Sequence, residues 1–103
     1  MKAQITKTNK YWRLIYYRPT NSGLAAETKH YLFFDGALHE WNRIRRTIER
    51  DIKANQKLRL INPHLLSSID QHFISKLLST GCKDITQRQY GYLTGILERQ
   101  QSN

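Results

Sequence analysis

The sequence predicts an α+β protein, in which a three-stranded antiparallel sheet packs on one basic amphipathic helix and a two-helix C-terminal hairpin follows. Three observations predict this fold class. Residues 1–34 hold β-branched and aromatic runs around a turn-forming segment. A long stretch with helical periodicity begins at Asp35, and two shorter helical patterns with capping residues complete the chain.

The strands are predicted from composition and from one turn signal. Residues 3–8 (AQITKT) and 11–18 (YWRLIYYR) are rich in residues that favour strands. Residues 18–23 (RPTNSG) concentrate Pro, Asn, Ser and Gly, which favour a chain reversal. Residues 27–34 (ETKHYLFF) are therefore expected to pair back as an antiparallel strand.

A helix is predicted from Asp35, which can cap its amino end, to Ala54. One side of this helix carries an apolar stripe that suits packing on a sheet: Ala37, Leu38, Trp41, Ile44, Ile48 and Ile52. The opposite side carries cationic residues and is called the cationic ridge: His39, Arg43, Arg46, Arg50, Lys53 and Lys57.

The second half predicts a helical hairpin. Residues 55–61 show no helical stripe and are interpreted as a connector. Asn62 and Pro63 then predict a helix start, and Gly81 its end; its stripe is Leu65, Leu66, Ile69, Phe73 and Leu77. Thr86 and Gln89 fit a capping box before a last stripe of Tyr90, Leu93, Ile96 and Leu97. We expect residues 1–54 and 62–103 to pack together as one compact domain.

Charge is concentrated in the first half. The chain has 17 Lys and Arg against 8 Asp and Glu, a formal net charge of +9. Residues 1–61 hold 13 of these cations and 5 of these anions, so they carry a net charge of +8. Such a charge suits a polyanionic partner, DNA more than RNA, or an acidic protein surface.

Several classes of function find no support in the pattern. The four histidines and Cys82 show no metal-ligand spacing, the acids show no acid–base pairing, and no glycine-rich phosphate loop is present. We therefore expect no enzyme activity, cofactor or metal. The single cysteine forms no internal disulfide, and the sequence shows no signal-type segment or run of about 20 apolar residues, so we expect a cytoplasmic protein without membrane contact.

The two sheet faces are predicted to have different roles. Trp12, Leu14 and Tyr16, with Leu32 and Phe34, are expected to meet Trp41, Ile44 and Ile48 in the core. The open face is then predicted to bind nucleic acid by stacking and phosphate contact, through Tyr11, Arg13, Tyr17, Lys29 and Tyr31. The alternative is that the C-terminal helices cover this second face.

The cationic ridge supplies a second predicted surface. Its arginines and lysines can contact successive phosphates, and the predicted residues are Arg43, Arg46, Arg50, Lys53 and Lys57. The alternative is a solvated helix face. Gly91 and Gly95 lie on one side of the last helix, where a close approach by another helix or by a partner would offset the cost of glycine.

Three segments carry a resemblance to a known family: YWRLIYYRP, HYLFFDGALHEW and the basic helix that follows. Residues 1–54 resemble the arm-type amino-terminal DNA-binding domain of phage integrases. The resemblance implies a three-stranded sheet in the major groove with a helix packed behind it. It also implies that Trp12 and Tyr16 are sheet residues, that Phe34 closes the last strand, and that Ala37 and Trp41 face the core.

The function predicted from the sequence is nucleic-acid binding through the cationic ridge and the open sheet face. The alternative is a phage- or mobile-element-type interaction protein that regulates or inhibits a host nucleic-acid-processing complex, with tyrosine or tryptophan as anchors. Either protein could act as a homodimer.

Overall fold

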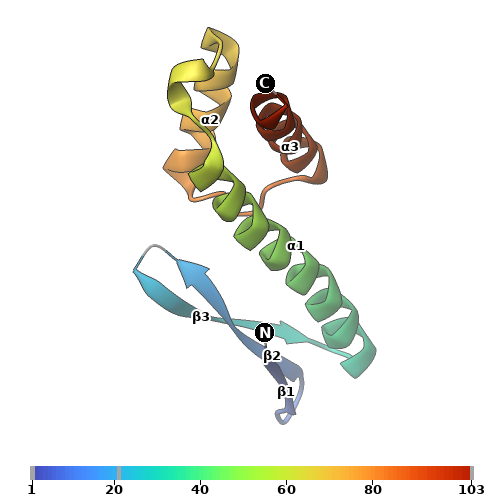
Figure 1. Cartoon of the computed structure of the whole chain (residues 1–103). Coiled ribbons are helices and arrows are strands. Elements are labelled where there is room, and N and C mark those ends of the chain that lie inside the picture. The colour runs from blue at the N-terminus through green and yellow to red at the C-terminus, as the bar shows by residue number, and fades with distance from the viewer. Residues whose placement is uncertain (1, 21, 103) are drawn as a thin grey trace. The chain divides into compact units, whose positions relative to one another are not determined.

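The computed structural model describes residues 2–20 and 22–102. Three strands precede the helices, which confirms the predicted α+β class (Figure 1). The elements are β1 (Ala3–Lys7), β2 (Trp12–Thr20), β3 (Gly23–Tyr31), α1 (Phe34–Leu60), the 3-10 helix η1 (Pro63–Leu65), α2 (Ser68–Thr80) and α3 (Gln87–Gln101). None of the described helices combines the length and the apolar character needed to cross a bilayer.

Backbone contacts divide the chain into two compact units, Met1–Arg46 and Thr47–Asn103, called here the first and second units. The predicted boundary at a connector, residues 55–61, is wrong, because α1 continues through this segment to Leu60. The division falls inside α1, so one helix contributes residues to both units.

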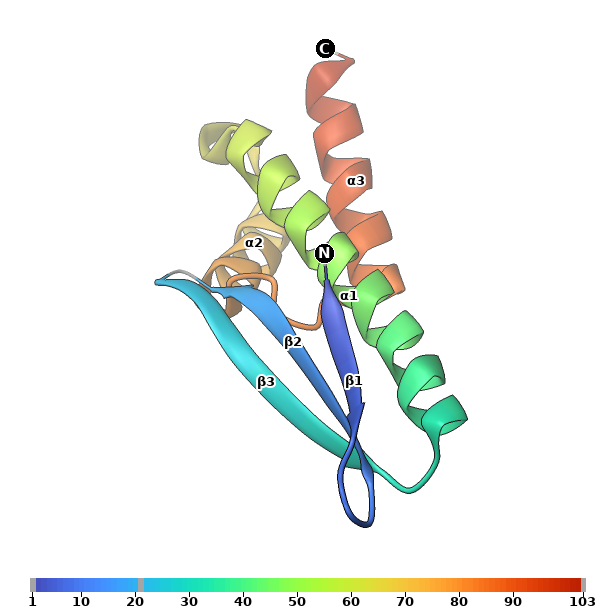
Figure 2. The same cartoon turned by 90° about the horizontal axis from the view of Figure 1, so that it is seen from below.

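The sheet is antiparallel, and β2 lies between β1 and β3 (Figure 2). β3 begins and ends earlier than predicted, at Gly23 and Tyr31. The reason is a tight turn: Thr20 already pairs with Gly23, and the Thr20 hydroxyl donates a hydrogen bond to the Gly23 carbonyl at 2.7 Å. Gly23 has φ of 119°, a backbone conformation that favours glycine.

The tight turn also sets which β3 residues share a face with Trp12, Leu14 and Tyr16. Directly paired residues lie on the same face of an antiparallel sheet. The partners in β3 are Tyr31, Lys29 and Glu27, in that order. The predicted position of Lys29 and Tyr31 on the open face is therefore wrong. A change of one residue in register moves every side chain of a strand to the other face.

The first unit has a small core of large side chains. Leu14, Tyr16, Ala37 and Ile44 are buried as predicted. The Trp41 ring lies 5.4 Å from the Tyr16 ring, measured between centroids. The predicted core position of Leu32 is wrong: β3 ends at Tyr31, and Leu32 is 72% exposed in the link to α1.

Phe34 and Glu27 contact residues of the first core at its edge. Phe34 begins α1 rather than closing the last strand, and it is exposed on one side while its ring packs edge-on against Trp12 at 5.1 Å. Tyr16 donates a hydrogen bond to Glu27. Burial and this hydrogen bond raise the pKa of the Tyr16 phenol, so Tyr16 stays neutral.

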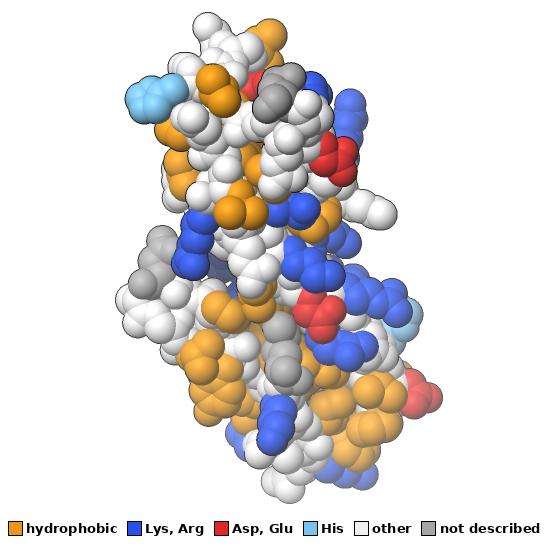
Figure 3. Space-filling model, viewed as in Figure 1, with side chains coloured by type: hydrophobic (Ala, Val, Ile, Leu, Met, Phe, Trp, Pro, Cys, Tyr) orange, Lys and Arg blue, Asp and Glu red, His pale blue; other side chains and the backbone are white. Residues whose placement is uncertain are grey.

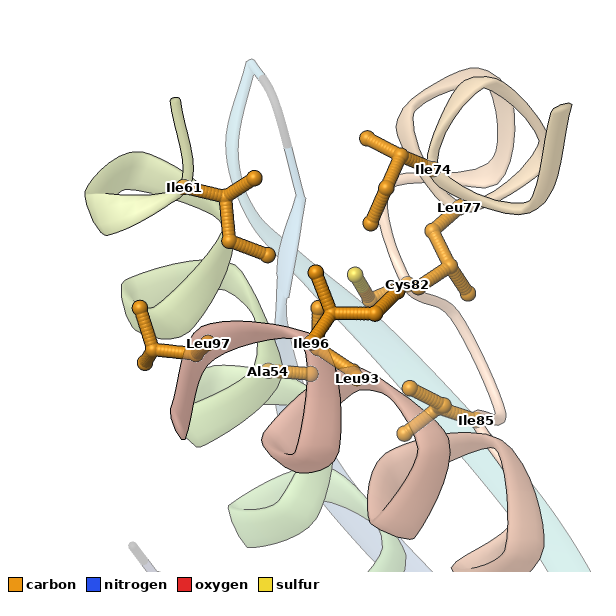
Figure 4. Packing of buried hydrophobic residues seen from close by; sticks show 9 residues of the cluster. All are labelled: Ala54, Ile61, Ile74, Leu77, Cys82, Ile85, Leu93, Ile96 and Leu97. Atoms are coloured by element: carbon orange, nitrogen blue, oxygen red, sulfur yellow. The ribbon is translucent and has the colours of Figure 1, made fainter. Parts of the chain in front are cut away.

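The second unit has an aliphatic core to which α1, α2, the α2–α3 link and α3 all contribute (Figure 4). Its buried members are Ala54, Ile61, Ile74, Leu77, Cys82, Ile85, Leu93, Ile96 and Leu97. Ala54, Leu58 and Ile61 form a stripe at helical spacing that does not continue the stripe of Ala37, Trp41 and Ile44. A search for one stripe along the helix therefore misses the last turns of α1.

The caps of α2 and α3 explain where these helices begin. Asn62 and Pro63 start only the short η1, and α2 begins after Ser67, whose hydroxyl accepts a hydrogen bond from the Asp70 amide. Leu65 and Ile69, predicted to lie in the stripe, are exposed. The predicted end at Gly81 and the capping box of Thr86 and Gln89 are both confirmed.

Candidate nucleic-acid interface

The open face of the sheet carries three of the five sheet residues that the sequence predicts. Tyr11, Arg13 and Tyr17 are exposed, with 45% of Tyr11 and 55% of Tyr17 accessible. Ile15 lies between Arg13 and Tyr17 and is half-buried. Two phenol rings and one guanidinium group are therefore presented on one side of β2, where they can contact a ligand.

The register adds His30 to this face. His30 pairs directly with Arg13, and its ring meets the Tyr11 ring edge-on at 5.4 Å. The Thr8 hydroxyl donates a hydrogen bond to the Tyr11 carbonyl at 2.9 Å, which holds the β1–β2 turn beside this ring pair. Strand alternation with Leu32 and Phe34 in the core would place His30 on the core face, but the pairing of Thr20 with Gly23 sets a register that places it on the open face.

Lys29 and Tyr31 lie on the face that also carries Trp12 and Leu14, and both are half-buried. Burial and the neighbouring Glu40 carboxylate raise the pKa of the Tyr31 phenol. The hydrogen bond from Arg43 lowers the pKa of Glu40. These groups form a polar border of the first core, so the structure does not bring Lys29 and Tyr31 together with Tyr11, Arg13 and Tyr17.

The cationic ridge divides into exposed and engaged residues. Arg46 and Lys53 are exposed, and neither forms an ion pair within residues 2–20 and 22–102. Arg43 is exposed but donates hydrogen bonds to Glu40, one of them from Nε at 3.1 Å. Figure 3 shows Lys and Arg side chains, in blue, along the course of α1 with acidic side chains among them.

Arg50 and Lys57 take part in the second unit itself. Arg50 donates a hydrogen bond to the Ile85 carbonyl at 3.2 Å. The Lys57 ammonium lies 5.6 Å from the centroid of the Tyr90 ring, within cation–π range. Both side chains are half-buried, so they are poor candidates for direct phosphate contact.

Next to Arg50, sequence reasoning missed a set of polar contacts that hold the α2–α3 link. The buried Asp51 carboxylate accepts hydrogen bonds from the backbone amides of Asp84 at 2.9 Å and Ile85 at 3.0 Å. Asn55 donates to the Gly81 carbonyl at 2.9 Å. Asp51 is one of few acids in a basic helix, and this was the available signal for a structural role.

The link needs this support because its backbone conformation is unusual. Gly81, Cys82 and Asp84 have positive φ values of 62°, 61° and 56°. Such conformations are disfavoured for residues other than glycine. The hydrogen bonds from Asp51 and Asn55 of α1 therefore stabilise a link whose backbone conformation is intrinsically disfavoured.

Cys82 lies within this link and is fully buried. Burial, with a smaller effect of the Asp51 charge, raises the pKa of its thiol to about 11. The thiol therefore stays protonated near neutral pH and is a poor nucleophile. Within the part of the chain that the structure describes, no group of three His, Cys, Asp or Glu side chains is placed to hold a metal ion.

Gly91 and Gly95 have no close neighbour from another element among the described residues. A Cβ atom added at Gly91 would meet nothing within 4 Å, and one at Gly95 would meet only the Arg99 side chain at 3.8 Å. Close packing by another described helix does not explain these glycines. Contact with a partner stays a prediction.

Comparison with protein-family models, with curated proteins and with solved structures finds no match. The resemblance of residues 1–54 to the arm-type domain of phage integrases therefore stays a prediction.

Proposed function

We propose that this protein binds nucleic acid through the first unit and the exposed cations of α1. The observation that carries the proposal is the open sheet face, where Arg13 and Tyr17 of β2 and Tyr11, which directly precedes β2, are exposed. Tyrosine rings stack on bases, and arginine neutralises phosphate. Aromatic rings that are needed only for stability would be buried, as Tyr16 is.

The distribution of charge supports binding of a polyanion by the first half of the chain. Residues 1–61 carry 13 Lys and Arg against 5 Asp and Glu. The positive field of this half would attract a polyanion and raise its association rate. Direct phosphate contacts are assigned to the exposed side chains of Arg13, Arg46 and Lys53, whereas Arg50 and Lys57 contribute their charge from structural positions.

A salt titration of binding tests this proposal. The triple variant Arg13→Ala, Arg46→Ala, Lys53→Ala should bind nucleic acid more weakly and reduce the slope of log K against log salt by about 2 to 3. A matched control, Lys76→Ala, Lys83→Ala, Arg88→Ala, removes the same charge from exposed positions outside the sheet and α1. Equal losses in both variants, or no binding by the unaltered protein at low salt, would contradict the proposal.

One observation favours a second function, binding of a protein partner. Leu60, Leu65, Ile69 and Leu78 in the second unit are each more than 60% exposed. Exposed aliphatic side chains of this kind are typical of protein interaction sites. Recovery of one stoichiometric protein after nuclease treatment, lost on Leu65→Ser with Ile69→Ser, would favour this function over direct nucleic-acid binding.

A further inference from the structure

Two large apolar side chains are exposed where the sheet joins α1. Leu32 is 72% exposed and Phe33 is 74% exposed. They follow Tyr31, the last residue of β3, and precede the first residue of α1. The core of the first unit forms without them, because its buried members are Leu14, Tyr16, Ala37 and Ile44.

This link adjoins the end of the sheet that carries the ring pair of Tyr11 and His30. The β1–β2 turn and the link between β3 and α1 lie at the same end of the sheet (Figure 2). Phe33 is three residues beyond His30, so their Cα atoms lie within about 10 Å of each other. Phe33 thus lies at the same end of the first unit as the Tyr11–His30 ring pair.

Cations lie close to the Tyr11–His30 ring pair in the chain and in the sheet. Lys10 precedes Tyr11, and Arg13 pairs with His30; both cations are exposed. At the same end of the sheet but on its other face, the Lys7 ammonium lies 5.7 Å from the centroid of the Trp12 ring. Asp35 is the nearest acid in the chain to Phe33. The local charge is positive, which complements a polyanion and disfavours an ordinary apolar protein surface as the occupant.

We infer that this end of the sheet stacks on unpaired bases, so that the preferred ligand is single-stranded nucleic acid. The inference rests on the proposed function and names its ligand class. Leu32, Phe33 and the Tyr11–His30 pair would contact bases, while Lys10 and Arg13 would contact the flanking phosphates. Positively charged surfaces with exposed aromatic side chains bind single strands in this way.

Charge alone would favour duplex over single-stranded nucleic acid. Duplex DNA carries one phosphate charge per roughly 1.7 Å of its axis and gives a steeper salt dependence per contact than a single strand. A surface that only neutralises phosphates therefore favours the duplex. Bases in a duplex are also stacked on one another, and separating them costs energy that an unpaired strand does not require. Tighter binding of the single strand than of the duplex would therefore indicate contact with bases.

The test compares the affinities of the full chain for a 20-nucleotide single strand and for the blunt duplex of the same sequence. These affinities are measured by fluorescence anisotropy at matched salt. The single strand should bind about tenfold more tightly, and Phe33→Ala should weaken single-strand binding about tenfold while leaving duplex binding unchanged. Leu24→Ala is the matched control, because Leu24 is a 71% exposed apolar residue of the same sheet. It lies at the opposite end from Phe33, beside the turn between β2 and β3.

Each outcome separates this inference from the proposed function. Duplex affinity equal to or above single-strand affinity would overturn the inference and leave the proposed function standing, as would equal effects of Phe33→Ala and Leu24→Ala. Absence of binding to both probes at low salt would overturn both. Circular dichroism of the Phe33→Ala variant should match that of the unaltered protein, because the replaced side chain is exposed.

Discussion

The two units use the same kinds of side chain differently. In the first unit, tyrosine and phenylalanine rings stand exposed at the sheet, and the core is small. In the second unit, the core is aliphatic, Lys57 covers the Tyr90 ring, and Phe73 packs on Tyr92 at 4.6 Å. Tyr17 and Phe33 of the first unit are thus largely exposed, whereas Tyr90 and Phe73 of the second unit are half-buried and held by internal contacts.

The cationic ridge of α1 shows this difference within one helix. Arg46 is exposed, whereas Arg50, one turn later on the same side, donates a hydrogen bond to the link between α2 and α3. The two arginines are equivalent in a helical-wheel diagram. Their roles differ because, among the described residues, Arg50 donates a hydrogen bond to a backbone carbonyl and Arg46 does not. Periodicity therefore identifies a charged face but does not show which of its charges are available.

The largest effect should come from removing the carboxylate that supports the α2–α3 link. Asp51→Ala leaves two backbone amides in the second unit without their acceptor, so we expect a loss of about 3 kcal/mol in the free energy of unfolding. Urea unfolding followed by circular dichroism measures this. Glu49→Ala, an exposed acid of the same helix, should change stability by less than about 0.5 kcal/mol. Similar effects of both variants would contradict the structural role of Asp51.

The next effect is a pH dependence that arises from Cys82. The pKa of its thiol is about 11 in the folded protein, above its ordinary value of 9.0. The folded state therefore holds this proton more tightly. The stability that depends on this proton is fully present below pH 9 and falls between pH 9 and pH 11. It is lost above the folded pKa, and the total loss is about 2 to 3 kcal/mol.

Unfolding measured from pH 8 to pH 11 tests this contribution. Cys82→Ala should be less stable at pH 8 because of the cavity. It should lose less stability on titration than the unaltered protein. The difference between the two proteins isolates the thiol from Tyr16, whose raised pKa in the folded state also makes stability depend on pH in this range. Parallel pH profiles would show that Cys82 is not protected by burial.

A smaller effect on stability is expected from the two arginines of the cationic ridge that differ in their contacts. Arg50→Ala should destabilise the protein by about 1.5 kcal/mol, because a charged donor to the Ile85 carbonyl is lost. Arg46→Ala should change stability by less than about 0.5 kcal/mol while reducing nucleic-acid affinity. Thermal unfolding and binding are measured on both variants. If Arg46→Ala destabilises as much as Arg50→Ala, the proposed division of the ridge is incorrect.

The smallest effect concerns Gly91 in α3. A Cβ atom has open space there, so Gly91→Ala should stabilise the second unit by about 1 kcal/mol through helix propensity. Nucleic-acid affinity should be unchanged. Weaker binding to any partner in this variant would instead support the predicted partner contact at Gly91.

The sequence predicted the order of the elements and the core side of β2, because strand alternation and helical periodicity are local signals. Leu14, Tyr16 and Ile44 are buried as expected, and Tyr11, Arg13 and Tyr17 are exposed. The sheet face predicted for Lys29 and Tyr31 was wrong. Which face these residues occupy depends on the pairing register of β2 and β3 across their turn, and composition does not determine that register.

The end of α1 and the roles of its polar residues could not be predicted for a different reason. Ala54, Leu58 and Ile61 form a new stripe whose partners, such as Leu93, lie far along the chain. Asp51 and Arg50 meet a link more than thirty residues away. Such contacts depend on tertiary structure, which local periodicity does not encode.

The most direct test of the central claim is nuclear magnetic resonance of the labelled full chain titrated with a single-stranded oligonucleotide at low salt. Chemical-shift changes should concentrate on the first unit, at Tyr11, Arg13, His30 and Phe33, and should be absent from α2. They should decline as salt is added. Changes concentrated around Leu65 and Ile69, or no changes at any residue, would contradict the account.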